Sequence, residues 1–324
     1  MSALPGLADV RAAAARLRGV AVRTPLLEFP VLNARMGGRV FVKPEIFQRT
    51  GSFKFRGAYN RIAQLSPEER RGGVVAWSSG NHAQGVAAAA AMLGLKAWIV
   101  MPADAPRIKT ERTRALGAEV VAYDRQRDAR EEIGRRIAAE HGAIIVPPFD
   151  DPHVIAGQGT VGLEIAEDAA ALGVALDAVL VPAGGGGLVA GTGLAFPDAK
   201  ATAIYCVEPQ DFDDHRRSLA AGERVGSPES AQSFCDALMA PLPGEMTFAI
   251  NKRRLAGGFG VSDAEVASAM RFAFEELKFV VEPGGAATLA ALLSGKFEAR
   301  DKSTAIVLSG GNVDPQLFAE VISV

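Results

Sequence analysis

Residues 74–101, VVAWSSGNHAQGVAAAAAMLGLKAWIVM, decide the fold because they hold two apolar runs separated by helix-forming residues. Residues 74–77 and 97–101 are apolar throughout, as buried strands are, whereas residues 83–93 are rich in alanine. Two strands without polar alternation, joined by a helix, predict a parallel sheet that is covered by helices on both faces.

The same alternation continues on both sides of Pro147 and Pro148. We predict further strands at residues 120–122, 144–146, 178–182, 203–207 and 305–308, with helices that include residues 108–116, 129–140 and 266–277. The prolines separate two runs of such units. The sequence therefore predicts two parallel-sheet α/β lobes, with the cleft between them as the place for a small ligand.

The composition is that of a globular protein and excludes several classes of partner. The 324 residues, 48% hydrophobic and 22% charged, are too many for one small core and suggest two lobes. A near balance of 35 basic and 37 acidic side chains leaves no positive field for nucleic acid or an anionic membrane. We expect a small-molecule partner, with no nucleic acid and no membrane.

The chain shows no pattern of an exported or membrane-spanning protein. Residues 1–19 lack the apolar core of a signal peptide and predict a surface amphipathic helix. The most apolar stretch, residues 86–101, is interrupted by Gly94 and Lys96. Cys206 and Cys235 form no C-x-x-C pair, so we expect two buried, reduced thiols. These features favour a cytoplasmic protein.

Four consecutive glycines, Gly184, Gly185, Gly186 and Gly187, follow a predicted strand and precede a helix-like stretch. Backbone N–H groups without neighbouring Cβ atoms, at the N-terminus of a helix, make a site for a phosphate. A flexible turn is the plainer interpretation.

A second interpretation of the glycines is a dinucleotide site. Gly185-x-Gly187-x-x-Ala190 fits the relaxed fingerprint, and Glu208 lies about 20 residues further on, where a ribose ligand is expected. A nicotinamide-dependent dehydrogenase (NAD as cofactor) therefore stays open at this point.

Residues 50–57, TGSFKFRG, place Lys54 between two phenylalanines. Desolvation would lower the pKa of such a lysine, and only the neutral amine attacks a carbonyl. The alternative is a solvated lysine in a loop.

Two polar turns follow predicted strands. Residues 78–82, SSGNH, offer two hydroxyls, an amide and helix-terminal N–H groups that can grip a carboxylate or a ring hydroxyl, although a simple helix cap has the same residues. Residues 309–312, SGGN, end a predicted strand, so Ser309 is expected to point into the cleft, unless this is only a strand-ending turn.

Residues 208–214, EPQDFDD, place two carboxylates six residues apart at the end of a predicted strand. Glu208 and Asp214, with the backbone carbonyl of Phe212 between them, have the chemistry to hold a hard divalent cation. An acidic surface turn is the alternative on spacing alone.

Together, and in the order in which they occur along the chain, these segments resemble the fold-type II pyridoxal 5'-phosphate (PLP) enzymes, of the threonine/serine dehydratase and serine racemase family that includes hydroxyaspartate dehydratases. The resemblance covers nearly the whole chain. It implies a tryptophan synthase β-subunit-like fold, with a large PLP-binding domain at residues 1–65 and 151–324 and a small domain at residues 66–150. It also implies a homodimer.

The resemblance assigns roles to individual residues. The catalytic residues would be Lys54 and Ser79. The cofactor would be bound by Phe53, Lys54, Asn81, Gly184, Gly185, Gly186, Gly187 and Ser309. The substrate would be bound by Ser78, Ser79, Asn81, His82 and Arg130. Mg²⁺, or Ca²⁺ or Mn²⁺ in its place, would be bound by Glu208, Phe212 and Asp214.

The reaction that the resemblance implies is dehydration and deamination of a β-hydroxy amino acid, such as L-threonine or L-serine, to a 2-oxo acid and ammonia. Lys54 would hold PLP and take the Cα proton. Ser79 matches the serine that serine racemases place opposite the lysine, on the other face of the cofactor. A 3-hydroxyaspartate dehydratase and a serine racemase with dehydratase side activity are therefore alternatives. Ala240, where mammalian-type racemases carry a serine, departs from the racemase pattern. A non-catalytic amino-acid binder is a further alternative.

Overall fold

The structure is a computed structural model that describes residues 4–105, 107–124, 126–197 and 201–323. Its strands form a six-stranded sheet in the order β1-β2-β10-β7-β8-β9 and a four-stranded sheet in the order β5-β4-β3-β6. The strands are β1 (Leu27–Glu28), β2 (Arg39–Pro44), β3 (Val74–Trp77), β4 (Ala97–Pro102), β5 (Glu119–Tyr123), β6 (Ile144–Ile145), β7 (Ala178–Pro182), β8 (Ala203–Pro209), β9 (Leu255–Val261) and β10 (Ser303–Leu308).

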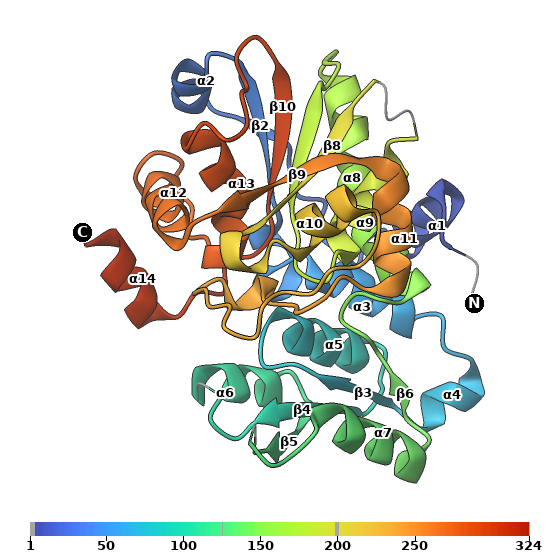
Figure 1. Cartoon of the computed structure of the whole chain (residues 1–324). Helices are drawn as coiled ribbons and strands as arrows, with labels where there is room; N and C mark the ends of the chain where they lie inside the picture. The colour runs from blue at the N-terminus through green and yellow to red at the C-terminus, as the bar shows by residue number, and fades with distance from the viewer. Residues whose placement is uncertain (1–3, 106, 125, 198–200, 324) are drawn as a thin grey trace.

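The α-helices alternate with these strands along most of the chain (Figure 1). They are α1 (Leu7–Leu17), α2 (Pro30–Met36), α3 (Lys54–Ile62), α4 (Pro67–Arg71), α5 (Asn81–Met92), α6 (Arg107–Ala115), α7 (Arg130–His141), α8 (Pro152–Ala171), α9 (Gly187–Ala195), α10 (Asp214–Ala221), α11 (Glu245–Arg254), α12 (Asp263–Glu275), α13 (Pro283–Leu293) and α14 (Pro315–Ile322).

The four-stranded sheet is parallel throughout and buried on both faces. Neighbouring strands pair in register, with Val74 opposite Ala97 in β3 and β4. Val74 and Ala76 pack with the alanines of α5 on one face, whereas Val75 packs with Ile137 of α7 on the other. Burial of alternate residues on opposite faces explains why these strands are apolar without interruption.

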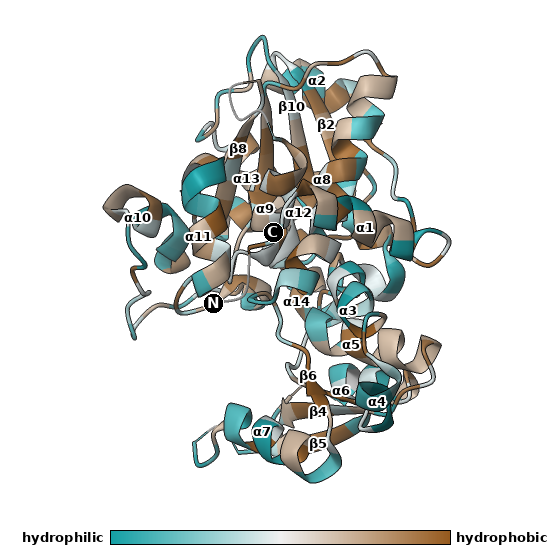
Figure 2. Cartoon of the chain, turned by 90° about the vertical axis from the view of Figure 1, so that its right-hand side faces the viewer, coloured by the Kyte–Doolittle hydropathy of each residue, from teal (hydrophilic) through white to brown (hydrophobic). Residues whose placement is uncertain are grey.

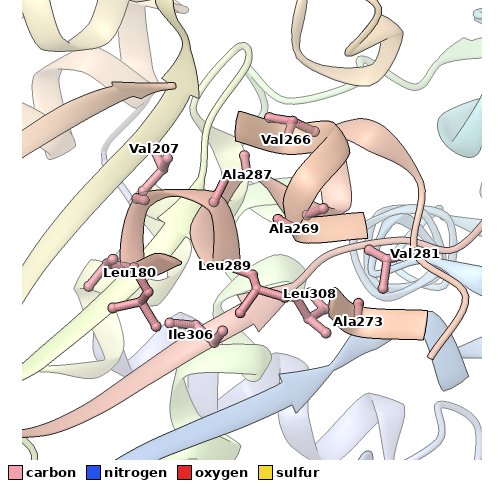
Figure 3. Close-up of a cluster of buried hydrophobic side chains, with 14 of the residues drawn as sticks. Leu180, Val207, Val266, Ala269, Ala273, Val281, Ala287, Leu289, Ile306 and Leu308 are labelled. Atoms are coloured by element: carbon pink, nitrogen blue, oxygen red, sulfur yellow. The ribbon is translucent and has the colours of Figure 1, made fainter. Parts of the chain in front are cut away.

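The six-stranded sheet is covered by α12 and α13 on one face and by α8 and α9 on the other. On the first face, Leu180 of β7 and Ile306 of β10 pack with Leu289 of α13 and Val266 of α12 (Figure 3). The strands of this core are hydrophobic and the outer helix faces are polar (Figure 2). A capping box starts α12, because Ser262 Oγ accepts from the Glu265 N–H and the Ser262 N–H donates to Glu265.

The predicted class of two parallel-sheet α/β domains is confirmed, with one exception in the larger sheet. β1 pairs antiparallel with β2, whereas the other neighbours in that sheet are parallel. The amphipathic helix expected at the N-terminus is α1, whose buried residues include Val10 and Leu17; residues 1–3 lie outside the described part. The strands of the small sheet fall within residues 74–145, and the domain limits at residues 65 and 151 remain a proposal.

Candidate active site

Lys54 is the first residue of α3 and lies partly buried where that helix meets residue 148. Its Nζ donates a hydrogen bond of 2.9 Å to the Pro148 carbonyl oxygen and lies 5.2 Å from the centre of the Phe53 ring. Burial lowers the pKa of this amine to about 8, and the negative charge of Glu282 acts in the opposite direction. Roughly a tenth of the amine is therefore neutral at pH 7, far more than for an ordinary lysine.

The four glycines form the turn between β7 and α9. Gly186 has φ +89°, and a methyl group added there would lie 2.4 Å from the His215 ring. A methyl group on Gly185 would lie 2.2 Å from the Phe149 ring. Phe149 directly follows the residue that accepts the Lys54 hydrogen bond, so the glycine turn and Lys54 border the same site.

The polar turn after β3 is shorter than predicted, because α5 begins at Asn81 and not near Ala83. Ser78 and Ser79 lie in this turn, and Ser78 Oγ accepts from the Gly80 N–H at 3.2 Å. Asn81 therefore occupies the first turn of the helix, where N–H groups lack intrahelical partners.

His82 is buried in the next position of α5. Its Nε2 lies 2.8 Å from the Val146 carbonyl oxygen, and its Nδ1 has no hydrogen-bond partner. Burial, together with the charge of Lys54, lowers the His82 pKa to about 3. His82 is thus neutral at physiological pH and cannot act there as an acid in its charged form.

The carboxyl end of β10 is distant from Lys54 in the sequence but borders the same site. The Ser309 carbonyl oxygen accepts from the Phe53 N–H at 3.1 Å, and Ser52 forms a β-bridge with Gly310. Ser309 is buried, at 4% exposed. The segments on either side of Lys54 and Ser309 are therefore fixed to each other by backbone hydrogen bonds.

Glu282 is a residue of this site that the sequence analysis did not identify. It is 4% exposed, and its Oε1 accepts from Asn81 Nδ2 at 2.6 Å. Asn312 Nδ2 in turn donates to Asn81 Oδ1 at 2.8 Å. An acidic residue within the apolar run before Pro283 was the available signal.

The arrangement fits a ligand that carries both a carbonyl and a phosphate. The glycine turn has no room for side chains and leads into a helix N-terminus, which suits a phosphate group. The desolvated Lys54 amine suits a carbonyl. Asn81 and Ser309 each supply a polar group to the site. PLP, which carries both a carbonyl and a phosphate, therefore matches the chemistry of the site.

The predicted metal residues lie at the end of β8. Glu208 is fully buried, and its oxygens accept from the backbone N–H groups of His215 and Arg216, both at 2.9 Å. Asp214 Oδ1 accepts from Ser227, whereas its Oδ2 is buried without a partner. Burial raises the pKa of Asp214 to about 7, and burial beside Asp214 raises that of Glu208.

The unpartnered Asp214 oxygen fits a cation bound from that side. However, no three His, Cys, Asp or Glu side chains within the described ranges are grouped to hold a metal ion. A cation would need the Phe212 carbonyl or water as further ligands.

The burial of Glu208 argues against the dehydrogenase interpretation. Its side chain is fully buried and fixed by two backbone N–H groups, so its oxygens are not exposed to the hydroxyl groups of a ribose, whereas their remaining lone pairs can still face a single buried ion. That interpretation also gives Lys54 and Ser309 no role.

Within the described residues, Arg130 forms no hydrogen bond or ion pair with the other predicted site residues. It begins α7, its side chain is 50% exposed, and its ion-pair partner is the neighbouring Glu131 at 3.6 Å. Its role in substrate binding stays a prediction.

The two α/β domains, with a desolvated lysine beside a glycine-lined helix terminus, define an enzyme whose ligand is held at both a carbonyl and a phosphate. The chain belongs to the family of pyridoxal-phosphate dependent enzymes, whose family model matches residues 17–310. Among the helices of the described residues, none combines the length and the apolar character of a membrane-spanning segment.

Similar proteins act on related amino acids, according to their names. The chain is 42% identical to an L-threo-3-hydroxyaspartate ammonia-lyase of Saccharomyces cerevisiae, over 99% of this chain and 97% of the relative. It is 43% identical to an L-threonine ammonia-lyase of Thermotoga maritima, over 98% of this chain and 78% of the relative. The structure of maize serine racemase matches with a TM-score of 0.92 and 35% identity, over 99% of this chain and 98% of that one.

Proposed function

We propose that the protein is a PLP-dependent ammonia-lyase that eliminates water from a β-hydroxy amino acid and yields a 2-oxo acid and ammonia. The observation that carries the proposal is the Lys54 amine, held by the Pro148 carbonyl beside the glycine turn. The names of the similar proteins support the same class of reaction.

When bound, PLP supplies an aldehyde that condenses with amines and a ring that withdraws electrons from the substrate Cα. The backbone N–H groups of Gly185, Gly186 and Gly187 would hold its phosphate at the α9 N-terminus. Asn81 would donate an N–H to a ring oxygen. Ser309, a neutral hydroxyl at the end of β10, would meet the ring nitrogen without imposing a charge on it.

Lys54 then acts as the base of the elimination. Its amine, with a pKa near 8, would take the proton from the substrate Cα and return it to the β-hydroxyl, so that the C–O bond breaks and water leaves. The enamine that is released hydrolyses to the 2-oxo acid and ammonia. We propose that Ser79, in the turn between β3 and α5, exchanges a Cα proton on the face opposite Lys54, which would permit some racemisation.

The test of this function is a substrate panel. Purified protein loaded with PLP is mixed with L-threonine, L-serine, 3-hydroxyaspartate and the D-enantiomers, and 2-oxo acid, ammonia and chirality are measured. We expect oxo acid from at least one L-substrate. Racemisation without oxo acid would favour the racemase, and binding without any turnover would favour the non-catalytic binder.

We predict that the apoprotein combines with PLP at a rate that rises with pH and levels off above about pH 8. Burial holds the Lys54 pKa near 8, so the amine is protonated and unreactive below that pH and neutral above it. Stopped-flow absorbance measures the rate. A rate that still climbs steeply at about pH 10, as for an ordinary lysine, contradicts the prediction.

We also propose that Mg²⁺ binds at Glu208, the Phe212 carbonyl and Asp214. Binding only to the folded state would raise the free energy of unfolding by about 2.7 kcal/mol at one hundred times the Kd. We predict that Mg²⁺ raises the melting temperature of the parent protein and of Asp211→Asn, an exposed neighbour, but not of Asp214→Asn. Equal shifts in both variants would place the cation elsewhere.

We propose, further, that the protein is a cytoplasmic homodimer. Phe47 and Val280, at 49% and 44% exposed, line one surface pocket with Ile46 and Phe279. Such an apolar patch is typical of an interface between proteins. Cys206 and Cys235 are free and buried, as in a reducing compartment. Sedimentation of twice the chain mass of 33.9 kDa, and recovery in the cytosolic fraction, are the expected results.

A further inference from the structure

A directed series of hydrogen bonds ends at Glu282. The Thr50 carbonyl oxygen can only accept, so Asn312 must turn its Nδ2 toward it, at 2.7 Å. The same Nδ2 donates to Asn81 Oδ1 at 2.8 Å, and Asn81 Nδ2 then donates to Glu282 Oε1 at 2.6 Å. Each amide therefore has one orientation, set by an acceptor at each end of the series.

Glu282 suits the end of this series because its ionised form, which predominates above the pKa of about 7 that burial gives it, offers acceptors only. Besides Asn81 Nδ2, it accepts from the Asn312 backbone N–H. Glu282 Oε1 lies in the space that a side chain at position 310 would need, because a methyl group on Gly310 would lie 2.3 Å from it. A buried carboxylate at 4% exposure is costly unless its acceptors are used, which indicates a role beyond packing.

We propose that Glu282 is a positioning residue that fixes the Asn81 amide, so that the remaining Asn81 N–H faces the cofactor. The inference rests on the proposed function, since it presumes PLP at Lys54. Glu282 acts through Asn81 and touches neither substrate nor reacting atoms in this role. The charged groups around it are Lys54 of α3, Lys109 of α6 and Asp236 of η4 (Asp236–Leu238).

The test is a double-mutant cycle read by PLP affinity and by the absorbance of the bound cofactor. Glu282→Gln keeps the shape of the side chain but leaves one acceptor oxygen for two donors, Asn81 Nδ2 and the Asn312 backbone N–H. We expect it to weaken PLP binding by about tenfold, the effect of one lost hydrogen bond to a charged group. The absorbance should shift toward the form with a protonated ring oxygen, because the N–H that stabilises the ionised oxygen is no longer held.

The Asn81→Ala background separates positioning from general stability. If Glu282 acts through Asn81, then adding Glu282→Gln to Asn81→Ala changes the affinity by less than about twofold. Asp236→Asn is the control, because it removes a nearby charge without touching Asn81, and it should keep the parent affinity and absorbance. An equal loss of affinity in both backgrounds, or an unchanged Glu282→Gln, overturns the inference while the proposed function stands.

Asn312→Asp serves if Glu282→Gln does not fold. It places acceptors opposite Asn81 Oδ1, so that no single orientation of the Asn81 amide satisfies both the new carboxylate and Glu282, and the same absorbance shift is expected. An unchanged absorbance in this variant also overturns the inference. A parent protein that binds no PLP at all would retire the proposed function, and this inference with it.

Discussion

Replacement of Lys54 by alanine is expected to abolish the attachment of PLP and to lower ammonia release by at least about 10³-fold. The amine is the nucleophile that we propose for the cofactor and also the base for the Cα proton, so one substitution removes both functions. The measurements are the absorbance of the dialysed protein and the initial rate of 2-oxo acid formation with the best substrate of the panel.

Lys96→Ala is the matched control for this variant. Lys96 is an exposed lysine of the small domain that pairs with Glu119 at its surface, so its loss should leave absorbance and rate at the parent level. A small primary amine added to Lys54→Ala should restore part of the rate. Full turnover in Lys54→Ala, with the cofactor still attached, is incompatible with the proposed mechanism.

Replacement of Gly186 by alanine is expected to weaken PLP binding by at least about 100-fold. Its added methyl group would lie 2.4 Å from the His215 ring, so the turn must move and its N–H groups no longer converge on one phosphate. Two lost hydrogen bonds to a charged group, at about 1.5 kcal/mol or more each, account for this factor. Fluorescence titration of the apoprotein measures the affinity.

Gly173→Ala separates the loss of the phosphate site from backbone strain. Gly173 has φ +68°, like Gly186 in the left-handed region, but nothing lies within 4 Å of an added methyl group. Gly173→Ala should lose about 1 kcal/mol of stability from backbone strain alone, Gly186→Ala should lose at least that much, and only Gly186→Ala should lose PLP. Equal PLP affinity in the two variants would show that the turn does not hold the phosphate.

Elements buried on both faces could be predicted from the sequence, and elements with buried charges or glycines could not. β3 and β7 have the predicted bounds, because each is an unbroken apolar run. β2 was missed because Lys43 interrupts it. That lysine is fully buried and pairs at 2.7 Å with Glu164, a partner that is distant in the sequence.

Helix α8 was missed for a related reason. Gly157, Gly159 and Gly162 reduce its helix propensity, but each faces a neighbouring backbone so closely that a methyl group would lie within 3.0 Å of it. Helix packing, which the local sequence does not reveal, requires these glycines. In the site, motif residues such as Lys54 and Asn81 were found, whereas Glu282 was not, because its importance depends on its contact with Asn81.

The bridge between Ser52 and Gly310 has a consequence for biosynthesis. A chain emerging from the ribosome carries Lys54 early, but the segment around Gly310 that immobilises the preceding residues is made much later. The nascent polypeptide therefore cannot complete its PLP-binding pocket until that distant segment has also left the ribosome.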